Sequence, residues 1–344
     1  MRCLGVDIGT TNIKMVELSS SGSEIELENY GVLETFSYLD RPNAAIQSNY
    51  FKIVEETTAG LLEKLFKSFK PKTKDVIMSL PIFSSFLTVF ELPFQDMKEI
   101  ERAIPFEAKK YIPLPLEELE IDWAMIKKDE GKSSAQILLI AVPKDLIVKY
   151  KKIAKLAGLN VVTLELESVA LARALIGSNK DPALLADIGS QSANLSIVDG
   201  GYLLSNENLT TAGAEISHVL ARGMGISQER AEEFKRIKGF NVSPQEAEIV
   251  DLMLPIADYF GSEISRAVAI YKEKTGKDIK RIIIAGGTAN LPGLADYLSQ
   301  TLNLSVERAW PFEGIKYQPF LEPLLKEIGP SLAVAVGLAK KGLS

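Results

Sequence analysis

Cysteine and histidine are almost absent from this sequence. Its 344 residues include one cysteine, Cys3, and one histidine, His218. A single cysteine excludes a disulfide within the chain, and the two residues together are too few for a zinc site of the Cys/His kind. A Ser-His-Asp triad would have to use His218, which we expect to pack in an apolar helix. The composition favours a reducing compartment such as the cytoplasm.

Long apolar runs are also missing. No window of about 20 apolar residues occurs, so we expect no membrane span, and the N-terminus enters a strand without the leader of a secreted protein. The formal net charge is -6 and the pI is about 5.2, which argues against a large nucleic-acid-binding face. The length and the 46% hydrophobic content predict a globular protein of two domains.

Two predicted hairpins carry an aspartate at the end of a buried strand. The first turn reads Asp7-Ile8-Gly9-Thr10-Thr11-Asn12, with Lys14 in the following strand, and the second reads Asp187-Ile188-Gly189-Ser190-Gln191. A carboxylate followed by backbone N–H, hydroxyl and amide groups is typical of a phosphate and metal site. The repeat predicts two related α/β halves that face each other across a nucleotide.

The order of the expected elements divides the chain into three parts. Residues 1–80 read as three strands, a loop at 40–50, a helix at 54–69 and a strand at 75–80, and residues 181–327 open with the same kind of hairpin. The segment 81–157 interrupts this pattern with strands and helices of its own. We expect it to be a small α+β subdomain inserted into the first half, which residues 158–180 and 328–344 complete. Helices at 168–175 and 331–341 are the expected hinge.

A glycine-rich turn follows the predicted strand at 280–285. Gly286 and Gly287 carry no Cβ and would let the backbone approach a flat ligand, together with Thr288. The alternative is a strand-to-helix turn that only requires a positive φ.

With these motifs in this order, the chain resembles the actin-like ATPase superfamily. The two hairpins, the helix after Glu167, the turn at 285–293 and the helix at 329–339 correspond to its phosphate-1, phosphate-2, connect-1, adenosine and connect-2 motifs. Within the superfamily the chain is most similar to the PilM-type proteins of type IV pilus assembly, relatives of FtsA, at 7–14, 106–113 and 166–173. The resemblance implies a duplicated, ribonuclease H-like two-domain fold with a nucleotide cleft and an inserted α+β subdomain.

The resemblance also implies ATP and Mg²⁺ as cofactors. Asp7 and Asp187 would hold Mg²⁺ through water, with Glu167 as the third group of the catalytic centre. The phosphates would contact Gly9, Thr10, Thr11, Asn12, Lys14, Gly189, Ser190 and Gln191, and the adenosine would contact Gly286, Gly287, Thr288, Glu263 and Arg266. Glu167 stands where Asp is usual and Ala193 where Thr is usual. We therefore expect ATP binding with weak or no hydrolysis.

The implied role is a cytoplasmic scaffold held at the inner membrane by its partner, the short N-terminal cytoplasmic tail of a PilN-type membrane protein. An extended peptide would bind a groove beside the insertion, formed by Phe83, Phe86, Ile104, Tyr111 and Ile112. Core packing is the alternative for each of these residues. Self-association stays open.

Three other functions fit the same fold: an FtsA-like division protein, an actin-like filament and a small-molecule kinase. The sequence ends directly after the connect-2 helix, which argues against an FtsA-like membrane-binding tail, and no acceptor-binding segment of a kinase is found.

Overall fold

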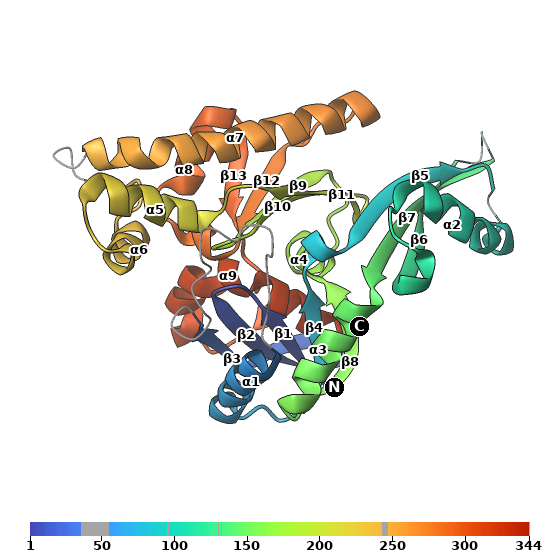
Figure 1. Cartoon of the computed structure of the whole chain (residues 1–344), viewed down its shortest axis with the longest axis horizontal. Coiled ribbons are helices and arrows are strands. Elements are labelled where there is room, and N and C mark those ends of the chain that lie inside the picture. The colour runs from blue at the N-terminus through green and yellow to red at the C-terminus, as the bar shows by residue number, and fades with distance from the viewer. Residues whose placement is uncertain (36–54, 95, 130, 132, 243–246, 344) are drawn as a thin grey trace.

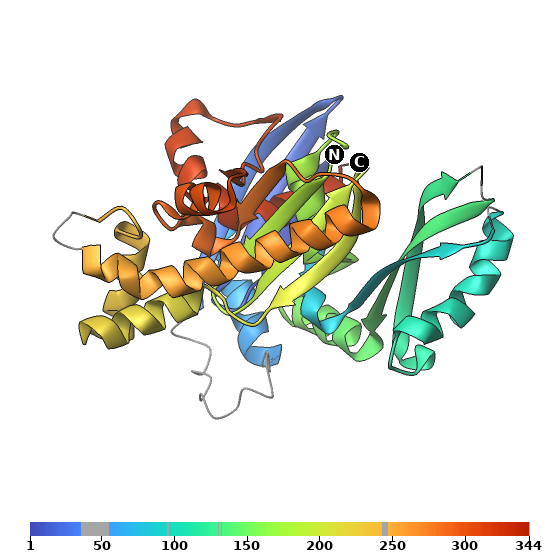
Figure 2. The same ribbon diagram turned by 90° about the horizontal axis from the view of Figure 1, so that it is seen from above.

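The computed structural model describes residues 1–35, 55–94, 96–129, 131, 133–242 and 247–343 (Figures 1 and 2). The loop expected at 40–50 lies outside these residues, as do the first residues of the helices expected to begin at 95 and 244. Among the described residues, no helix is long and apolar enough to cross a membrane.

The first sheet is built around the first hairpin. Its strand order is β14-β3-β2-β1-β4-β8, with bounds β1 (Arg2–Ile8), β2 (Asn12–Ser21), β3 (Glu24–Glu34), β4 (Asp75–Leu80), β8 (Asn160–Leu166) and β14 (Ile315–Lys316). Alternate residues of β1 face opposite sides. Leu4 and Val6 join the core under α1 (Glu55–Phe69) and α3 (Lys144–Leu156). On the other side Cys3 and Gly5 face α4 (Glu167–Ile176) and α9 (Glu322–Lys341).

The second sheet repeats the order β3-β2-β1-β4-β8 of the first sheet, which has β14 as an additional edge strand. It runs β11-β10-β9-β12-β13, with bounds β9 (Ala183–Ile188), β10 (Ala193–Asp199), β11 (Tyr202–Leu209), β12 (Arg281–Ala285) and β13 (Ser305–Arg308). In both sheets three antiparallel strands are followed by two parallel ones. Its helices are α5 (Gly213–Met224), α6 (Gln228–Ile237), α7 (Ala247–Thr275) and α8 (Leu294–Leu302). The duplication predicted from the two hairpins is therefore present in the strand order.

The inserted sheet lies to one side of the two larger sheets (Figures 1 and 2). Its order is β5-β7-β6, with bounds β5 (Phe86–Leu92), β6 (Leu119–Asp129) and β7 (Ser134–Pro143). Helix α2 (Met97–Tyr111) covers one face, because its apolar residues Ile100, Ile104 and Ala108 recur at helical spacing. Asp96 caps the helix by accepting from the backbone of Lys98 and Glu99.

Two segments pack differently from the expected division of the chain. Helix α3, assigned above to the insertion, packs on α1 in the core of the first sheet, where Tyr150 and Ile153 are buried. Strand β14, assigned to the second half, pairs with β3 of the first sheet. On this packing we propose that the insertion ends with β7 and that the chain returns to the first half before β14.

Helix α9 begins at Glu322 rather than at 331, and Pro330 lies inside it. A Cβ on Gly337 of α9 would lie 1.9 Å from the carbonyl oxygen of Ala170 in α4, and one on Gly5 of β1 would lie 2.1 Å from that of Ala335. These glycines let the helix meet its neighbours backbone to backbone. The end of α9 also covers Cys3: a Cβ on Gly342 would lie 2.2 Å from its Sγ.

Candidate functional site

The two hairpin turns are closed by equivalent backbone hydrogen bonds. The amide of Gly9 donates to the carbonyl of Asn12, and that of Gly189 to the carbonyl of Ser192, both at 2.9 Å. In the first turn Thr11 accepts from the amide of Thr35 at 2.8 Å, and in the second Ser190 accepts from that of Ala214 at 2.7 Å. The other predicted phosphate contacts, Thr10, Asn12 and Gln191, lie in these turns and are half-buried or exposed.

Asp7 is held from two sides at the end of β1. Its Oδ2 accepts from Lys14 Nζ at 2.9 Å and its Oδ1 from Ser79 Oγ at 2.8 Å. Both Asp7 and Lys14 are buried. Burial alone would lower the pKa of Lys14, but Asp7, and more weakly Asp187 and Glu167, raise it above its ordinary value. The lysine therefore stays a cation, ready to meet an anion such as a phosphate.

Glu167 and Asp187 complete a group of carboxyls around this lysine. Burial, with Asp187 and then Asp7 nearby, raises the pKa of Glu167 to about 8. Burial also raises the pKa of Asp187 to about 6, although Lys14 opposes the shift. Glu167 Oε1 accepts from the backbone amide of Ile82 at 3.2 Å and from Asn194 Nδ2 at 3.3 Å. Lys14 alone does not neutralise these carboxyls once they ionise, and a second cation would relieve the repulsion between them.

The donor set fits Mg²⁺ held through water. Carboxylate oxygens suit this ion, which keeps much of its hydration shell. Among the described residues, no group of three or more His, Cys, Asp and Glu side chains is close enough to hold a metal ion directly. Asp7 and Asp187 are the residues that would hold an ion between the two hairpins, and water would supply the rest of its coordination sphere.

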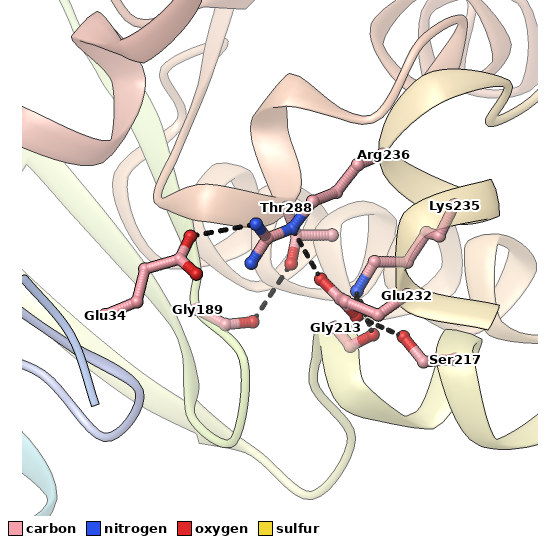
Figure 3. Close-up of polar contacts among 8 residues, drawn as sticks. All are labelled: Glu34, Gly189, Gly213, Ser217, Glu232, Lys235, Arg236 and Thr288. Carbon is pink, nitrogen blue, oxygen red and sulfur yellow. Dashed lines mark hydrogen bonds and ion pairs between the residues drawn. The ribbon is translucent and has the colours of Figure 1, made fainter. Parts of the chain in front are cut away.

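The glycine-rich turn after β12 packs on the second hairpin. Gly286 has φ +82°, and a Cβ there would lie 2.6 Å from Asp187 Oδ1. Thr288 is buried and its Oγ1 donates to the carbonyl of Gly189 at 3.0 Å (Figure 3). A Cβ on Gly287 would meet nothing within 4 Å. Of the three predicted residues, Gly287 borders open space, while Gly286 and Thr288 contact the second hairpin.

A network on α6 was not anticipated. Lys235 is buried, and its Nζ donates to the carbonyl of Gly213 at 3.1 Å and to Glu232 Oε2 at 2.6 Å (Figure 3). Glu232 also accepts from Ser217 and from Arg236. The amide of Gly213 donates to Gly189, so the network borders the second hairpin.

Arg236 also connects the two halves of the molecule. Its Nη1 lies 2.9 Å from Oε1 of Glu34, the last residue of β3 in the first sheet (Figure 3). The only sequence signal was the spacing of Glu232, Lys235 and Arg236 by three and four positions, which is typical of any exposed helix with ion pairs.

The structure does not bring Glu263 and Arg266 to this site. Both lie on α7, where Arg266 pairs with Glu263 and with Glu207 of β11. Strands β10 and β9 separate β11 from β12, which precedes the glycine-rich turn. The resemblance had implied that both residues contact the adenosine, but their ion pairs lie at the other edge of the sheet.

A cavity of 180 Å³ lies between the insertion and the second sheet. Three of the five predicted groove residues line it, namely Phe86, Tyr111 and Ile112. Ile104 is instead buried in the core of the insertion, and Phe83 does not line the cavity. The opposite wall, which was not predicted, consists of Asn206 and Asn208 of β11.

The fold and the site together define a class. Two equivalent sheets, each with a strand-end aspartate and a tight turn, are the architecture of the actin-like ATPase fold. The sequence matches the family "Type IV pilus assembly protein PilM" over residues 5–343. The chain belongs to this family.

Solved structures agree with this assignment. The chain is similar to a PilM-PilN type IV pilus biogenesis complex, with a TM-score of 0.84 and 25% identity over 99% of this chain and 98% of the other. The fold of MreB 5 of Spiroplasma citri bound to AMPPNP is also similar, with a TM-score of 0.52 and 15% identity over 98% of this chain and 94% of the other.

Two curated relatives lie further away. Cell division protein FtsA of Staphylococcus epidermidis is 20% identical over 96% of this chain and 79% of its own length. Ethanolamine utilization protein EutJ of Escherichia coli is 29% identical over 41% of this chain, and the match spans 45% of its length.

Proposed function

We propose that this protein is an ATP-binding scaffold of the type IV pilus inner-membrane platform, which binds the cytoplasmic tail of a PilN-type membrane protein. The observation that carries the nucleotide part is the pair of equivalent hairpins with Lys14 among the carboxyls. The cavity between β5 and β11 carries the partner part. The family match and the similarity to a PilM-PilN complex support the partner part.

In the nucleotide site each hairpin would offer backbone N–H groups to the phosphates. Lys14 would turn from Asp7 toward them as a point charge. Mg²⁺, held through water by Asp7 and Asp187, would balance the negative charge of the carboxylates and of the phosphates. On α6, Glu232 and Lys235 would border the ribose, since they lie next to Gly213 and the second hairpin. ATP binding also has support from the nucleotide-bound MreB 5 fold.

Hydrolysis would be slow for two reasons in this chain. Glu167 Oε1 accepts from the backbone amide of Ile82 and from Asn194 Nδ2, so this oxygen is already engaged and is a poor acceptor for the proton of the attacking water. Ala193 has no hydroxyl to offer beside the second turn.

The partner would bind as an extended peptide. Strands β5 and β11 are edge strands of their sheets, and edge strands present free backbone groups to an added strand. Tyr111 is 46% exposed at the cavity and would cover the apolar side chains of the tail. The tail would hold the scaffold at the inner membrane.

The test measures both ligands in one preparation. Calorimetry with Mg-ATP should show binding by the wild type and none by Asp7→Ala/Asp187→Ala, with little phosphate release in the same samples. Fluorescence anisotropy with a labelled synthetic tail peptide should show weaker binding by Tyr111→Ala. The matched control is Phe106→Ala, an aromatic residue of the same helix that is 72% exposed and does not line the cavity. Equal loss in both variants, or rapid phosphate release, would refute the proposal.

A further inference from the structure

Two helices of the first half carry a concentration of lysines that neither proposed site uses. Helix α1 with the turn after it spans residues 55–74, and α3 spans residues 144–156. Together they contain ten lysines, no arginine and four acidic residues, in a chain whose net charge is -6. Nine of these lysines are exposed, namely Lys64, Lys67, Lys70, Lys72, Lys74, Lys144, Lys151, Lys152 and Lys155. An acidic protein therefore has one strongly basic surface.

The basic segments end at the same place. Strands β4 and β8 are parallel, and each begins shortly after one of the two helices, so α1 and α3 both run toward the start of these strands. The helices lie side by side on the first sheet (Figure 1). At their ends the amide of Asn160 donates to the carbonyl of Lys74 at 2.9 Å. The lysines at this end form one surface, which we call the basic end: Lys70, Lys72, Lys74, Lys151 and Lys155.

Most of the charge of the basic end is not neutralised within the chain. Lys72 lies 3.2 Å from a carboxylate oxygen of Glu28, but the same carboxylate also pairs with Arg2. Asp75 accepts a hydrogen bond from the side chain of Asn160. Within the part of the chain that the structure describes, four side chains have no ion pair or hydrogen bond, namely those of Lys70, Lys74, Lys151 and Lys155.

Aliphatic side chains lie among these lysines. Val148 and Leu156 are 63% and 51% exposed, and their spacing of eight positions places them on one stripe of α3. Val162 of the edge strand β8, which contacts α3, is 62% exposed. In these fully described elements none of the large exposed apolar side chains is aromatic. Cations with aliphatic side chains are typical of a face that enters lipid headgroups, whereas proteins that bind single-stranded nucleic acid stack its bases on aromatic side chains.

We propose that the basic end docks directly on an anionic lipid surface, with Val148, Leu156 and Val162 entering the headgroup region. Lysine ammonium groups are point charges on apolar stems and suit a fluid surface of many phosphates, whereas arginine suits one phosphate held in a fixed geometry. The proposed tail would bring the protein to the inner membrane, and in this respect the inference rests on the proposed function. Tail and lipid together would hold the scaffold in one orientation.

Co-sedimentation of the full chain with vesicles, without nucleotide or tail peptide, tests this docking. The vesicles consist of phosphatidylcholine alone or of equal parts phosphatidylcholine and phosphatidylglycerol. The wild type should bind only the anionic vesicles, and high salt should release it. Each lysine near an anionic surface contributes roughly fivefold to partitioning. Replacement of two lysines, Lys151→Glu/Lys155→Glu, should therefore lower the partition coefficient by at least about 25-fold.

The matched control makes the same charge change elsewhere. Lys127→Glu/Lys128→Glu replaces two exposed lysines of β6 in the insertion and should lower the partition coefficient by less than about 3-fold, because salt screens distant charges. All the substituted side chains are exposed, so the variants should melt at the temperature of the wild type. An equal loss in the two variants would overturn the inference, as would a wild type that does not bind the anionic vesicles.

A third variant separates a lipid surface from other anionic partners. Val148→Ser/Leu156→Ser keeps every charge and should weaken vesicle binding by at least about 5-fold, since the apolar contact is lost. Its binding to a DNA duplex, used as a soluble polyanion, should equal that of the wild type. Vesicle binding unchanged in this variant, or wild-type binding to the duplex as tight as to the vesicles, would overturn the inference. The proposed function would survive these outcomes, because nucleotide and tail binding are measured without lipid.

Discussion

Replacing Glu167 by glutamine should stabilise the nucleotide-free protein, and more so at high pH. The pKa of Glu167 is about 8 in the folded protein against an ordinary value of 4.5, because the carboxyl is buried near Asp187 and Asp7. A raised carboxyl pKa adds stability below pH 4.5 that is lost as the pH rises through 8. The glutamine variant has no such loss, since its side chain does not ionise.

The magnitude follows from the width of this pH window. At about 1.4 kcal/mol per pH unit, complete ionisation would cost at most about 5 kcal/mol. The side chain is only partly buried, and water screens part of the repulsion, so we expect a gain of about 2 kcal/mol at pH 8.5.

Thermal unfolding without nucleotide, followed by fluorescence at pH 6.0 and pH 8.5, measures the effect. About 1 kcal/mol of this gain is already present at pH 6.0, so the melting temperature of Glu167→Gln should exceed that of the wild type by about 1 to 2 °C more at pH 8.5 than at pH 6.0. Glu63→Gln, at an exposed position of α1, serves as the control and should show no such difference. If the gain from Glu167→Gln is the same at both pH values, Glu167 is ionised throughout and our description of the carboxyl group is wrong.

Three further substitutions test other parts of the structure. Arg236→Ala removes the ion pair with Glu34 between the halves and should speed release of a fluorescent ATP analogue about 2- to 5-fold in stopped-flow experiments, an effect that high salt should abolish. Lys14→Met should weaken Mg-ATP binding by about 10- to 100-fold in calorimetry, as expected for the loss of a charged hydrogen bond. Gly337→Ala places a methyl against the backbone of α4 and should destabilise the fold by at least about 2 kcal/mol in urea unfolding. In contrast Gly60→Ala in α1, where a Cβ meets nothing, should be neutral or stabilising.

The features that could be predicted from the sequence are those formed by residues close together in the chain. Both hairpins have a strand, a turn and a strand in continuous sequence, so Asp7, Asp187 and the duplicated strand order could be recognised from the order of the residues alone. The end of the insertion was harder to place. The residues of α3 form an apolar face, but their pattern does not indicate whether this face packs on α1 or on the inserted sheet.

Contacts between distant segments were not predictable in the same way. The α6 network depends on Gly213 and Glu34, which are 22 and 202 positions away from their partners. The cavity wall at Asn206 is polar and lies on an edge strand, whereas the predicted groove consisted of apolar residues. Arg266 was expected at the ligand only from the family resemblance, and its pairing with Glu207, which is 59 positions away, could not be predicted from spacing.

Because the end of α9 covers Cys3, the single thiol of this chain can report when that end of the helix opens. Burial raises the pKa of the Cys3 thiol to about 11, so in the native state it should be inert to alkylating reagents at neutral pH. Reaction then requires the end of α9 to lift away from β1. Pulsed alkylation would time that local opening directly, and cysteines introduced on the surface could be labelled selectively without removing the natural one.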